Sequence, residues 1–361
     1  MITRKTLWRD AAVAGVTLLT LAAGGVLFAW SGAYNIAASR GHWAIVEWML
    51  RFGMTNSVEL RAAMIAAPDL SADGLVTVGA NHYRTGCAYC HGAPGIKASP
   101  VSQSSLPPPP DLSDVSDRWS DSELFWVVKN GIKYTGMPSW PTQKRDHEVW
   151  AVVAFLKAMK SMSPDAYRAM QPEAPASSTP AEREAIANCD GCHGAAGQEP
   201  RTSFVPVLYG QKRDYVIAAL EDYASGRRES GMMQPIANDL PPAAISELAA
   251  HYAERAPAAV SPDVADSRLE AGRKLATAGL PEAGIPGCNS CHGDNSLPTY
   301  PRLTGQSAAY MASQLQLWRA GMRGSEGQAA IMAPIAKRLS DEQIDAVSRF
   351  YASPSALQAA N

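Results

Sequence analysis

The six cysteines of the sequence fall in three pairs that share one spacing, with two residues between the thiols and a histidine directly after the second. These groups are Cys87, Cys90 and His91; Cys189, Cys192 and His193; and Cys288, Cys291 and His292. Two thiols at this spacing can bond to the vinyl groups of one haem, and the adjacent histidine is then held against the iron as its proximal ligand. The alternatives are redox disulfides or zinc sites, but zinc needs two more ligands for each pair. The pattern therefore predicts three covalently bound haem c groups.

Each iron needs a sixth ligand, and methionine is the usual one where a c-type haem carries electrons, because it raises the reduction potential. Met332 lies 40 residues after His292 and Met233 lies 40 residues after His193, both in a Met-x-Pro-Ile-Ala sequence, while Met137 lies 46 residues after His91. The neighbouring Met232 pairs with the apolar Ile331 in this register. The predicted iron ligands are therefore His91, Met137, His193, Met233, His292 and Met332.

The remaining histidines do not recur at matching positions, so we expect them to be surface or packing residues, with His82 on the helix that leads into the first site. They are His42, His82, His147 and His251. Pro206 and Pro301 recur after the cysteine motif, and their carbonyls could accept a hydrogen bond from the proximal imidazole and so fix its orientation. The matching proline of the first site is one of residues 107–110.

The haem motifs recur at intervals of 102 and 99 residues, by subtraction of the positions of their first cysteines, which predicts three successive domains. The second and third are copies of one another. At an offset of 95, the residues Pro206, Gly210, Gln211, Tyr215 and Leu220 match Pro301, Gly305, Gln306, Tyr310 and Leu315. At an offset of 99, the residues Met233, Pro235, Ile236, Ala237, Leu240 and Tyr252 match Met332, Pro334, Ile335, Ala336, Leu339 and Tyr351.

The elements that position these residues are predicted to be helices, because apolar residues recur at helical spacing and strand-like alternation is nearly absent. The stretches are 182–187, 215–225, 243–253, 269–276, 310–320 and 341–351. Ser340, with Gln343 three residues later, predicts a capped helix start. The fold class is thus all-α, with an amino-terminal transmembrane helix followed by three tandem domains.

Proline, serine and alanine in residues 164–180 indicate a mobile linker, whereas the join near residues 256–262 is shorter. We therefore expect the second and third domains to pack as a pair and the first to sit on its own linker. The predicted division is 1–31 anchor, 32–70 helical connector, 71–163 first domain, 164–180 linker, 181–258 second domain and 262–355 third domain.

The amino end carries Arg4, Lys5 and Arg9 and then an uncharged stretch over residues 11–30, which is long enough to span a membrane. A cleaved signal peptide is the alternative, but its apolar region is normally shorter. Basic residues before the span place everything after Trp30 on the outer side, where bacteria attach haem c. Residues 42–67 have helical spacing and either lie along the membrane surface or pack on the first domain.

The whole chain, 361 residues long, contains 46% apolar and 18% charged residues, as ordinary folded proteins do. Its length predicts two or three domains. The formal net charge of −2 argues against nucleic acid as a general partner.

Residues 72–355 resemble the class I cytochromes c. The second and third domains, with Pro-x-Leu-x-Gly-Gln, Gly-x-Arg and Met-x-Pro-Ile-Ala, resemble the dihaem cytochrome c4 type and the trihaem cytochrome subunits of membrane alcohol and gluconate dehydrogenases. The first domain, with Cys-Ala-Tyr-Cys-His-Gly and Thr-Gly-Met-Pro-Ser-Trp, resembles another branch of the superfamily. The resemblance implies small helical domains wrapped around haem.

These features predict an electron carrier and not an enzyme, because histidine and methionine together leave no open position on iron. Its partners would be redox proteins, such as a dehydrogenase, a quinol-oxidising complex or a terminal oxidase, together with the membrane. The expected location is the bacterial inner membrane, with a single span and the haem domains in the periplasm. The alternatives are a dedicated cytochrome subunit of a membrane dehydrogenase of the alcohol or gluconate type, and a haem peroxidase with one displaceable ligand.

Overall fold

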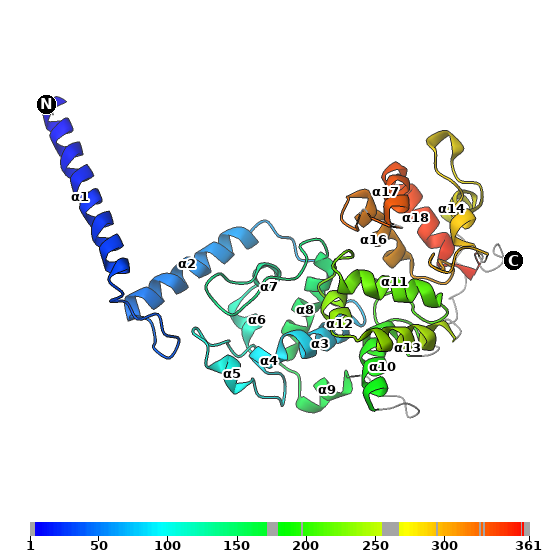
Figure 1. Ribbon diagram of the computed structural model, residues 1–361, viewed down its shortest axis with the longest axis horizontal. Helices are drawn as coiled ribbons and strands as arrows, with labels where there is room; N and C mark the ends of the chain where they lie inside the picture. The colour runs from blue at the N-terminus through cyan, green and yellow to red at the C-terminus, as the bar shows by residue number, and fades with distance from the viewer. Residues whose placement is uncertain are drawn as a thin grey trace.

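A computed structural model describes residues 4–171, 180–195, 198–254, 267–293, 295–324, 326–327, 329–354 and 356. Over these ranges the chain is helical without a β-strand, and only two isolated bridges occur, between Ala93 and Ile96 and between Leu280 and Ile285. The all-α prediction is confirmed. Figure 1 shows a single long helix at the amino end, set apart from a row of helical units.

The first unit consists of α3 (Leu75–Gly86), α4 (Ala88–His91), α5 (Pro100–Gln103), α6 (Val115–Arg118), α7 (Asp121–Asn130), α8 (Asp146–Met159) and α9 (Pro164–Ala169). Its core is built where α3 crosses α8. A β-carbon on Gly79 would lie 2.0 Å from the Ala151 carbonyl oxygen, so the two backbones touch at a position where only glycine leaves room. The Tyr83 and Phe155 rings pack beside this crossing, 4.9 Å apart.

The second unit consists of α10 (Pro180–His193), α11 (Arg213–Ala224), α12 (Met233–Asn238) and α13 (Pro242–Ala253). The third consists of α14 (Ser267–Thr277), η1 (Pro281–Ala283), α15 (Asn289–His292), α16 (Ala308–Arg319), α17 (Ala329–Arg338) and α18 (Asp341–Tyr351). Gly272 on α14 faces the Ala346 carbonyl of α18, which repeats the close crossing of the first unit. Ser340 and Gln343 form the predicted capping box at the start of α18.

In the second and third units, the motif helix is tied to the last helix of the unit by a repeated contact. Tyr252 on α13 donates to Asp190, between Cys189 and Cys192, over 2.8 Å. Tyr351 on α18 donates to Asn289, at the matching place of the third motif, over 2.5 Å. The last helix of each copy therefore holds the cysteine motif in place.

The first unit extends beyond the predicted boundary at residue 163. Helix α9 lies in the stretch predicted as linker, and Tyr167 is buried in the same core as Phe155. Ser163 caps this helix by accepting from the Ala166 amide, and Pro164 occupies its first turn. Most of the rest of the predicted linker, and the join near residues 256–262, lie outside the described residues.

The second and third units pack through reciprocal contacts. The Gln211 side chain donates to the Arg302 carbonyl over 2.6 Å and accepts from the Arg302 amide over 3.0 Å. The Gln306 side chain makes the same pair of bonds with Val207, over 3.0 Å and 2.8 Å. Because both pairs share the offset of 95, the two copies meet as the subunits of a two-fold symmetric dimer would. The expected pairing of these two units is therefore confirmed.

The first unit does not stand apart from the second, in contrast to the expectation from the linker. Asn81 and Arg84 on α3 donate to residues 191 and 188 of α10 over 3.3 Å and 2.5 Å. On the other side, Glu148 on α8 accepts from Gly231 over 2.7 Å. Gly231 lies flat on Trp140, since a β-carbon there would be 1.8 Å from the indole nitrogen. The difference arises because these contacts join surfaces far apart in sequence, which the composition of the linker does not reveal.

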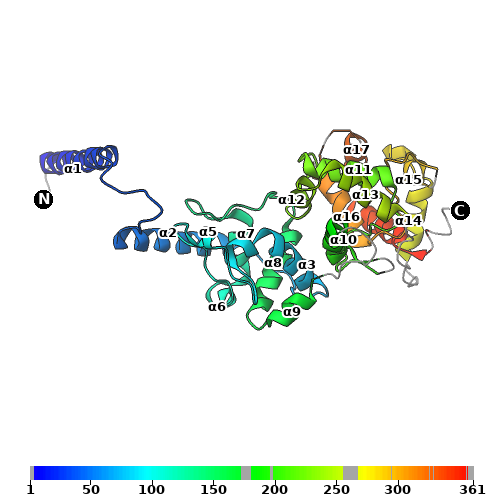
Figure 2. The same ribbon diagram turned by 60° about the horizontal axis from the view of Figure 1, so that its bottom comes forward.

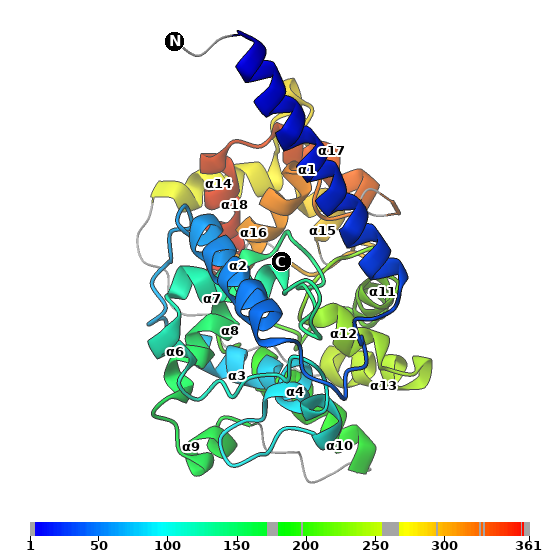
Figure 3. The same ribbon diagram turned by 90° about the vertical axis from the view of Figure 1, so that its left-hand side faces the viewer.

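Helix α1 (Arg4–Trp30) extends away from the helical units, and α2 (Ala44–Ala62) follows it (Figures 1 and 2). Figure 3 is viewed from the side of α1 and α2, which are drawn in front of the helical units. The stretch Trp8–Trp30 is the one described helix long and apolar enough to cross a membrane, and none of it is buried. The carboxyl half of α2 packs on the first domain through the buried Val58 and Ala62.

Candidate haem sites

All three motif histidines are oriented by a proline carbonyl. Nδ1 of His193 lies 2.8 Å from the carbonyl oxygen of Pro206, and Nδ1 of His292 lies 3.0 Å from that of Pro301, as predicted. Nδ1 of His91 lies 2.9 Å from the carbonyl oxygen of Pro110, which identifies the matching proline of the first site. With Nδ1 donating to a carbonyl, Nε2 carries the free lone pair that an iron ion needs.

Four of the six cysteine thiols lie in surroundings that keep them protonated. Burial raises the pKa of Cys87 and of Cys189 to about 12, and those of Cys192 and Cys288 to about 11. A redox-active Cys-x-x-Cys pair has the opposite character, with a lowered pKa in an electropositive, partly exposed place. No disulfide joins any of the six. The raised pKa of these four thiols thus differs from that of a redox-active pair.

The arrangement of donor side chains gives the zinc alternative no support. Across the ranges that the structure describes, no three His, Cys, Asp or Glu side chains gather as a metal site would require. The thiols, imidazoles and methionines instead line one branching hollow. Its lining includes Cys87, Cys90, His91, Met137, Cys189, Cys192, His193, Met233, Cys288, Cys291, His292 and Met332.

Comparison with known families matches two parts of the chain. Residues 74–156 match the model described as cytochrome c oxidase, cbb3-type, subunit III, and residues 269–353 match the model described as cytochrome c. A thiosulfate dehydrogenase electron acceptor of Thiomonas intermedia is 34% identical over 204 residues, which cover 55% of this chain and 88% of that protein. Cytochrome c4 of Thiocapsa roseopersicina is 36% identical over 192 residues, which cover 50% of this chain and 95% of that protein.

The chain belongs to the class I c-type cytochromes, with cytochrome c4-like domains. Its function is electron transfer by a multihaem cytochrome. Among solved structures, the reduced cytochrome c4 of Pseudomonas stutzeri is 31% identical, with a TM-score of 0.43. The aligned region covers 49% of this chain and 99% of that one. Since such relatives cover about half of this cytochrome, the contacts between its first domain and the c4-like pair must be interpreted from its own residues.

Two buried arginines between the second and third domains indicate whether the hollow suits the negatively charged propionates of haem. Arg228 and Arg323 are 6% and 9% exposed, and no described carboxylate lies within ion-pair distance of either. Arg228 donates to Tyr310 over 2.7 Å, while its Nε has no described partner. Buried cations require anionic partners, and haem carries two propionates. The arginines of the two Gly-x-Arg sequences are thus suited to bind haem propionates in this hollow.

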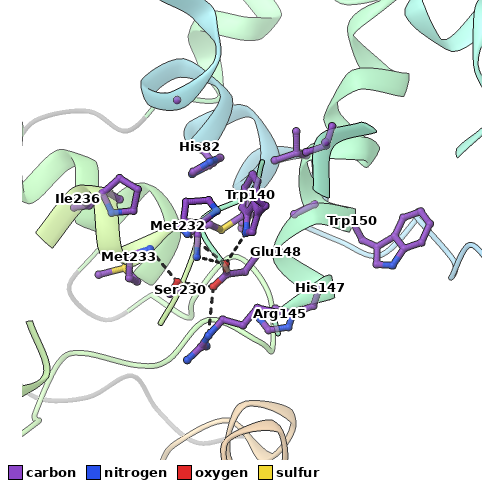
Figure 4. Close-up of a pocket in the computed structure, with 18 of the residues that line it drawn as sticks. His82, Trp140, Arg145, His147, Glu148, Trp150, Ser230, Met232, Met233 and Ile236 are labelled. Atoms are coloured by element: carbon purple, nitrogen blue, oxygen red, sulfur yellow. Dashed lines mark hydrogen bonds and ion pairs between the residues drawn. The ribbon is translucent and has the colours of Figure 1, made fainter. Parts of the chain in front are cut away.

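The two adjacent methionines of the second domain point to different surroundings. Met232 packs against the core of the first domain, and Figure 4 shows it beside His82 and Trp140. Met233 points away from that core. Met137 and Met332 are half-buried in the lining of the same hollow. Met232 and Met233 are likewise half-buried and both line this hollow. Only the packing of Met232 against the core of the first domain favours Met233 as the ligand of the second haem.

The other histidines serve packing, as expected. His82 lies on α3, 4.7 Å from the Trp140 ring, and burial lowers its pKa to about 4. His147 stacks on Phe204 of the second domain, at 5.3 Å between ring centroids. His251 lies against Tyr252 on α13. His42 interacts with Tyr34 near the end of α1.

Proposed function

We propose that this cytochrome is a membrane-anchored electron carrier with three haem c groups. Each iron would have one histidine and one methionine as its axial ligands. The thiols of Cys87 and Cys90, of Cys189 and Cys192, and of Cys288 and Cys291 would attach the haem groups. The axial pairs would be His91 with Met137, His193 with Met233, and His292 with Met332. Bound haem would supply the change of iron oxidation state that stores one electron. The observation that carries the proposal is that each oriented histidine and its methionine line the same hollow.

The proposed domain division follows the three motifs. We propose cytochrome domains over 71–170, 181–258 and 262–355, after an anchor at 1–31 and a connector at 32–70; the end of the first domain thus moves from residue 163, as expected from the sequence, to residue 170. The packing of α9 supports counting residues up to Met170 with the first domain. That leaves a shorter linker than residues 164–180.

The membrane proposal is supported by the aromatic side chains around the end of α1. Phe28 and Trp43 lie 5.9 Å apart, Tyr34 and Trp43 lie 5.1 Å apart, and Trp48 stacks on Phe52. Aromatic residues gather where a span leaves the hydrocarbon region. The exposed amino half of α2 supports its placement on the membrane surface, while its carboxyl half packs on the first domain. The haem domains would then face the periplasm of a bacterial inner membrane.

The proposed partners are redox proteins on that side, which include dehydrogenases, quinol-oxidising complexes and terminal oxidases. A second candidate is a dedicated subunit of one dehydrogenase. Its support is the relative named as an electron acceptor of thiosulfate dehydrogenase. The alcohol or gluconate type rests on sequence resemblance alone. In both cases the chain itself is a carrier and not an enzyme.

Retention by the span can be measured by fractionation. We expect the full chain to stay with membranes through washes at high salt and alkaline pH, because a 23-residue apolar helix has no buried face within the protein. A variant whose residues 1–31 are replaced by a cleavable export signal should instead be recovered in the soluble fraction with its haem. A mature amino terminus that begins after Trp30 would contradict the anchor.

The carrier assignment can be tested with carbon monoxide and peroxide. We expect the reduced protein, shown by mass to carry three haems, to keep an unchanged low-spin spectrum under carbon monoxide at neutral pH, because each iron already has six ligands. Hydrogen peroxide should not be turned over. Stoichiometric carbon monoxide binding at one haem together with peroxide turnover would instead support the peroxidase alternative.

A further inference from the structure

We propose that Glu148 of the first domain is a positioning residue for the methionine ligand of the second haem. The proposal rests on the proposed ligation by Met233. It assigns to the contact between the two domains the task of holding that ligand on iron.

Glu148 is a buried carboxylate that receives its hydrogen bonds from the segment before Met233. Only 5% of it is exposed. One oxygen accepts from the Gly231 amide over 2.7 Å and from the Met232 amide over 3.3 Å, and the other accepts from the Ser230 hydroxyl. Trp140 of the first domain also donates to it, over 3.2 Å, and Figure 4 shows the arrangement.

The chain of hydrogen bonds continues to the ligand residue itself. The Ser230 hydroxyl oxygen accepts from the Met233 amide over 3.0 Å. Glu148 therefore reaches the backbone of Met233 through one hydroxyl group. Hydrogen bonds to a charged acceptor are stronger than those between neutral groups, and a buried carboxylate keeps its donors in fixed places.

Neighbouring residues of the first domain brace the same segment. Arg145 donates to the Glu229 carbonyl over 2.6 Å. Arg145 also lies 3.9 Å from Glu148 and balances its charge. Residues 229–232 are thus held by Arg145 and Glu148 at the start of α8.

The third domain lacks this arrangement at the matching place. At the offset of 99, Ser230 corresponds to Ala329, which has no hydroxyl group. Residues 329–332 there already belong to α17, whereas α12 begins only at Met233. The turn that leads into Met233, together with its serine, occurs in the copy that faces Glu148, as positioning by the first domain requires.

Displacement of the methionine by added imidazole tests the proposal in the complete oxidised holoprotein. A thioether is a weak ligand, so its residence on iron depends on how firmly the protein holds its backbone. In Glu148→Gln, one oxygen becomes an amide group that cannot accept from the donors it faces. We expect loss of the methionine-to-iron absorption band at one of the three haems to become at least about tenfold faster.

Glu229→Gln is the matched control, since it makes the same change at the same interface. Among the described residues, its carboxylate accepts from Thr142 and Lys144, at the partly exposed edge, and it is not part of the chain of bonds from Glu148 through Ser230 to Met233. Displacement should stay within about twofold of the parent. Ser230→Ala should accelerate it, and the double variant with Glu148→Gln should fall short of the product of the two effects, because both act through one link.

The outcomes separate the proposal from the ligation on which it rests. In a Met233→Ala background, Glu148→Gln should cause no further band loss. If Met233→Ala leaves all three bands in place, the ligation itself is wrong. If Met233→Ala removes one band but Glu148→Gln and Ser230→Ala leave its displacement rate unchanged, Glu148 is not a positioning residue. If Glu148→Gln raises the reduction potential of the second haem without faster displacement of its methionine, Glu148 acts through its charge and not by positioning the ligand. If Glu148→Gln does not fold, the displacement rate of Ser230→Ala alone tests the proposal.

Discussion

Replacing Met233 with alanine should abolish the methionine-to-iron absorption band of one haem in three and lower the reduction potential of that haem. The reason is that the thioether favours reduced iron, and its loss leaves the histidine-ligated iron to water or to a stronger donor. Potentiometric titration of the holoprotein, followed in the absorption spectrum, measures both effects. The other two haems should titrate as in the parent.

Met232→Ala is the matched comparison, because it makes the same change one residue earlier. Its side chain is half-buried against the core of the first domain. We expect the band to persist, with a loss of about 1–2 kcal/mol in the contact between the two domains. The assignment is overturned if Met232→Ala removes the band and Met233→Ala does not.

Gly79→Val should destabilise the first domain by about 3 kcal/mol or more. The first atom of the new side chain would overlap the Ala151 carbonyl, at 2.0 Å, and press on Phe155, at 2.9 Å. Since α3 and α8 form the core of this domain, the helices would have to separate. Thermal unfolding should then show an early transition, which near-ultraviolet circular dichroism of the aromatic core can follow.

Thr85→Val places the same side chain on the same helix at an exposed position, so its effect should stay within about 0.5 kcal/mol. Gly272→Val should produce the matching loss in the third domain, where the Ala346 carbonyl would be 2.2 Å from the new atom. Equal stability of Gly79→Val and Thr85→Val would show that the two helices do not approach as closely as described.

The parts of the site that are local in sequence were predictable. The spacing of Cys87, Cys90 and His91 identifies the chemistry, and the same logic holds for the two copies. The carbonyl partners Pro206 and Pro301 follow from their recurrence, and the structure confirms both. Capping of α18 by Ser340 is likewise a short-range feature, because the two bonding groups lie three residues apart.

Contacts between domains could not be predicted in this way. Pro110 was one of four adjacent prolines, and only the path of the chain selects it. Glu148 has no sequence signal, since a glutamate in the first turn of a helix is ordinarily solvated. Helix α9 was hidden in a stretch whose prolines suggested a linker, although Pro164 instead begins a helix. The sequence shows that Gln211 of the second domain recurs as Gln306 of the third. It does not show that each of these side chains bonds to the backbone of the other domain.

The contact between Gly231 and Trp140 also discriminates between the two c4-like copies. The third domain carries Ala330 at the position that matches Gly231. Its methyl group would collide with an indole placed as Trp140 is, because a β-carbon at Gly231 would lie 1.8 Å from the ring nitrogen. The second domain has no methyl group at this position and can pack on the first domain. The third domain has one, at Ala330, which would prevent the same packing. The two copies of one domain on this chain are in this way kept from exchanging places.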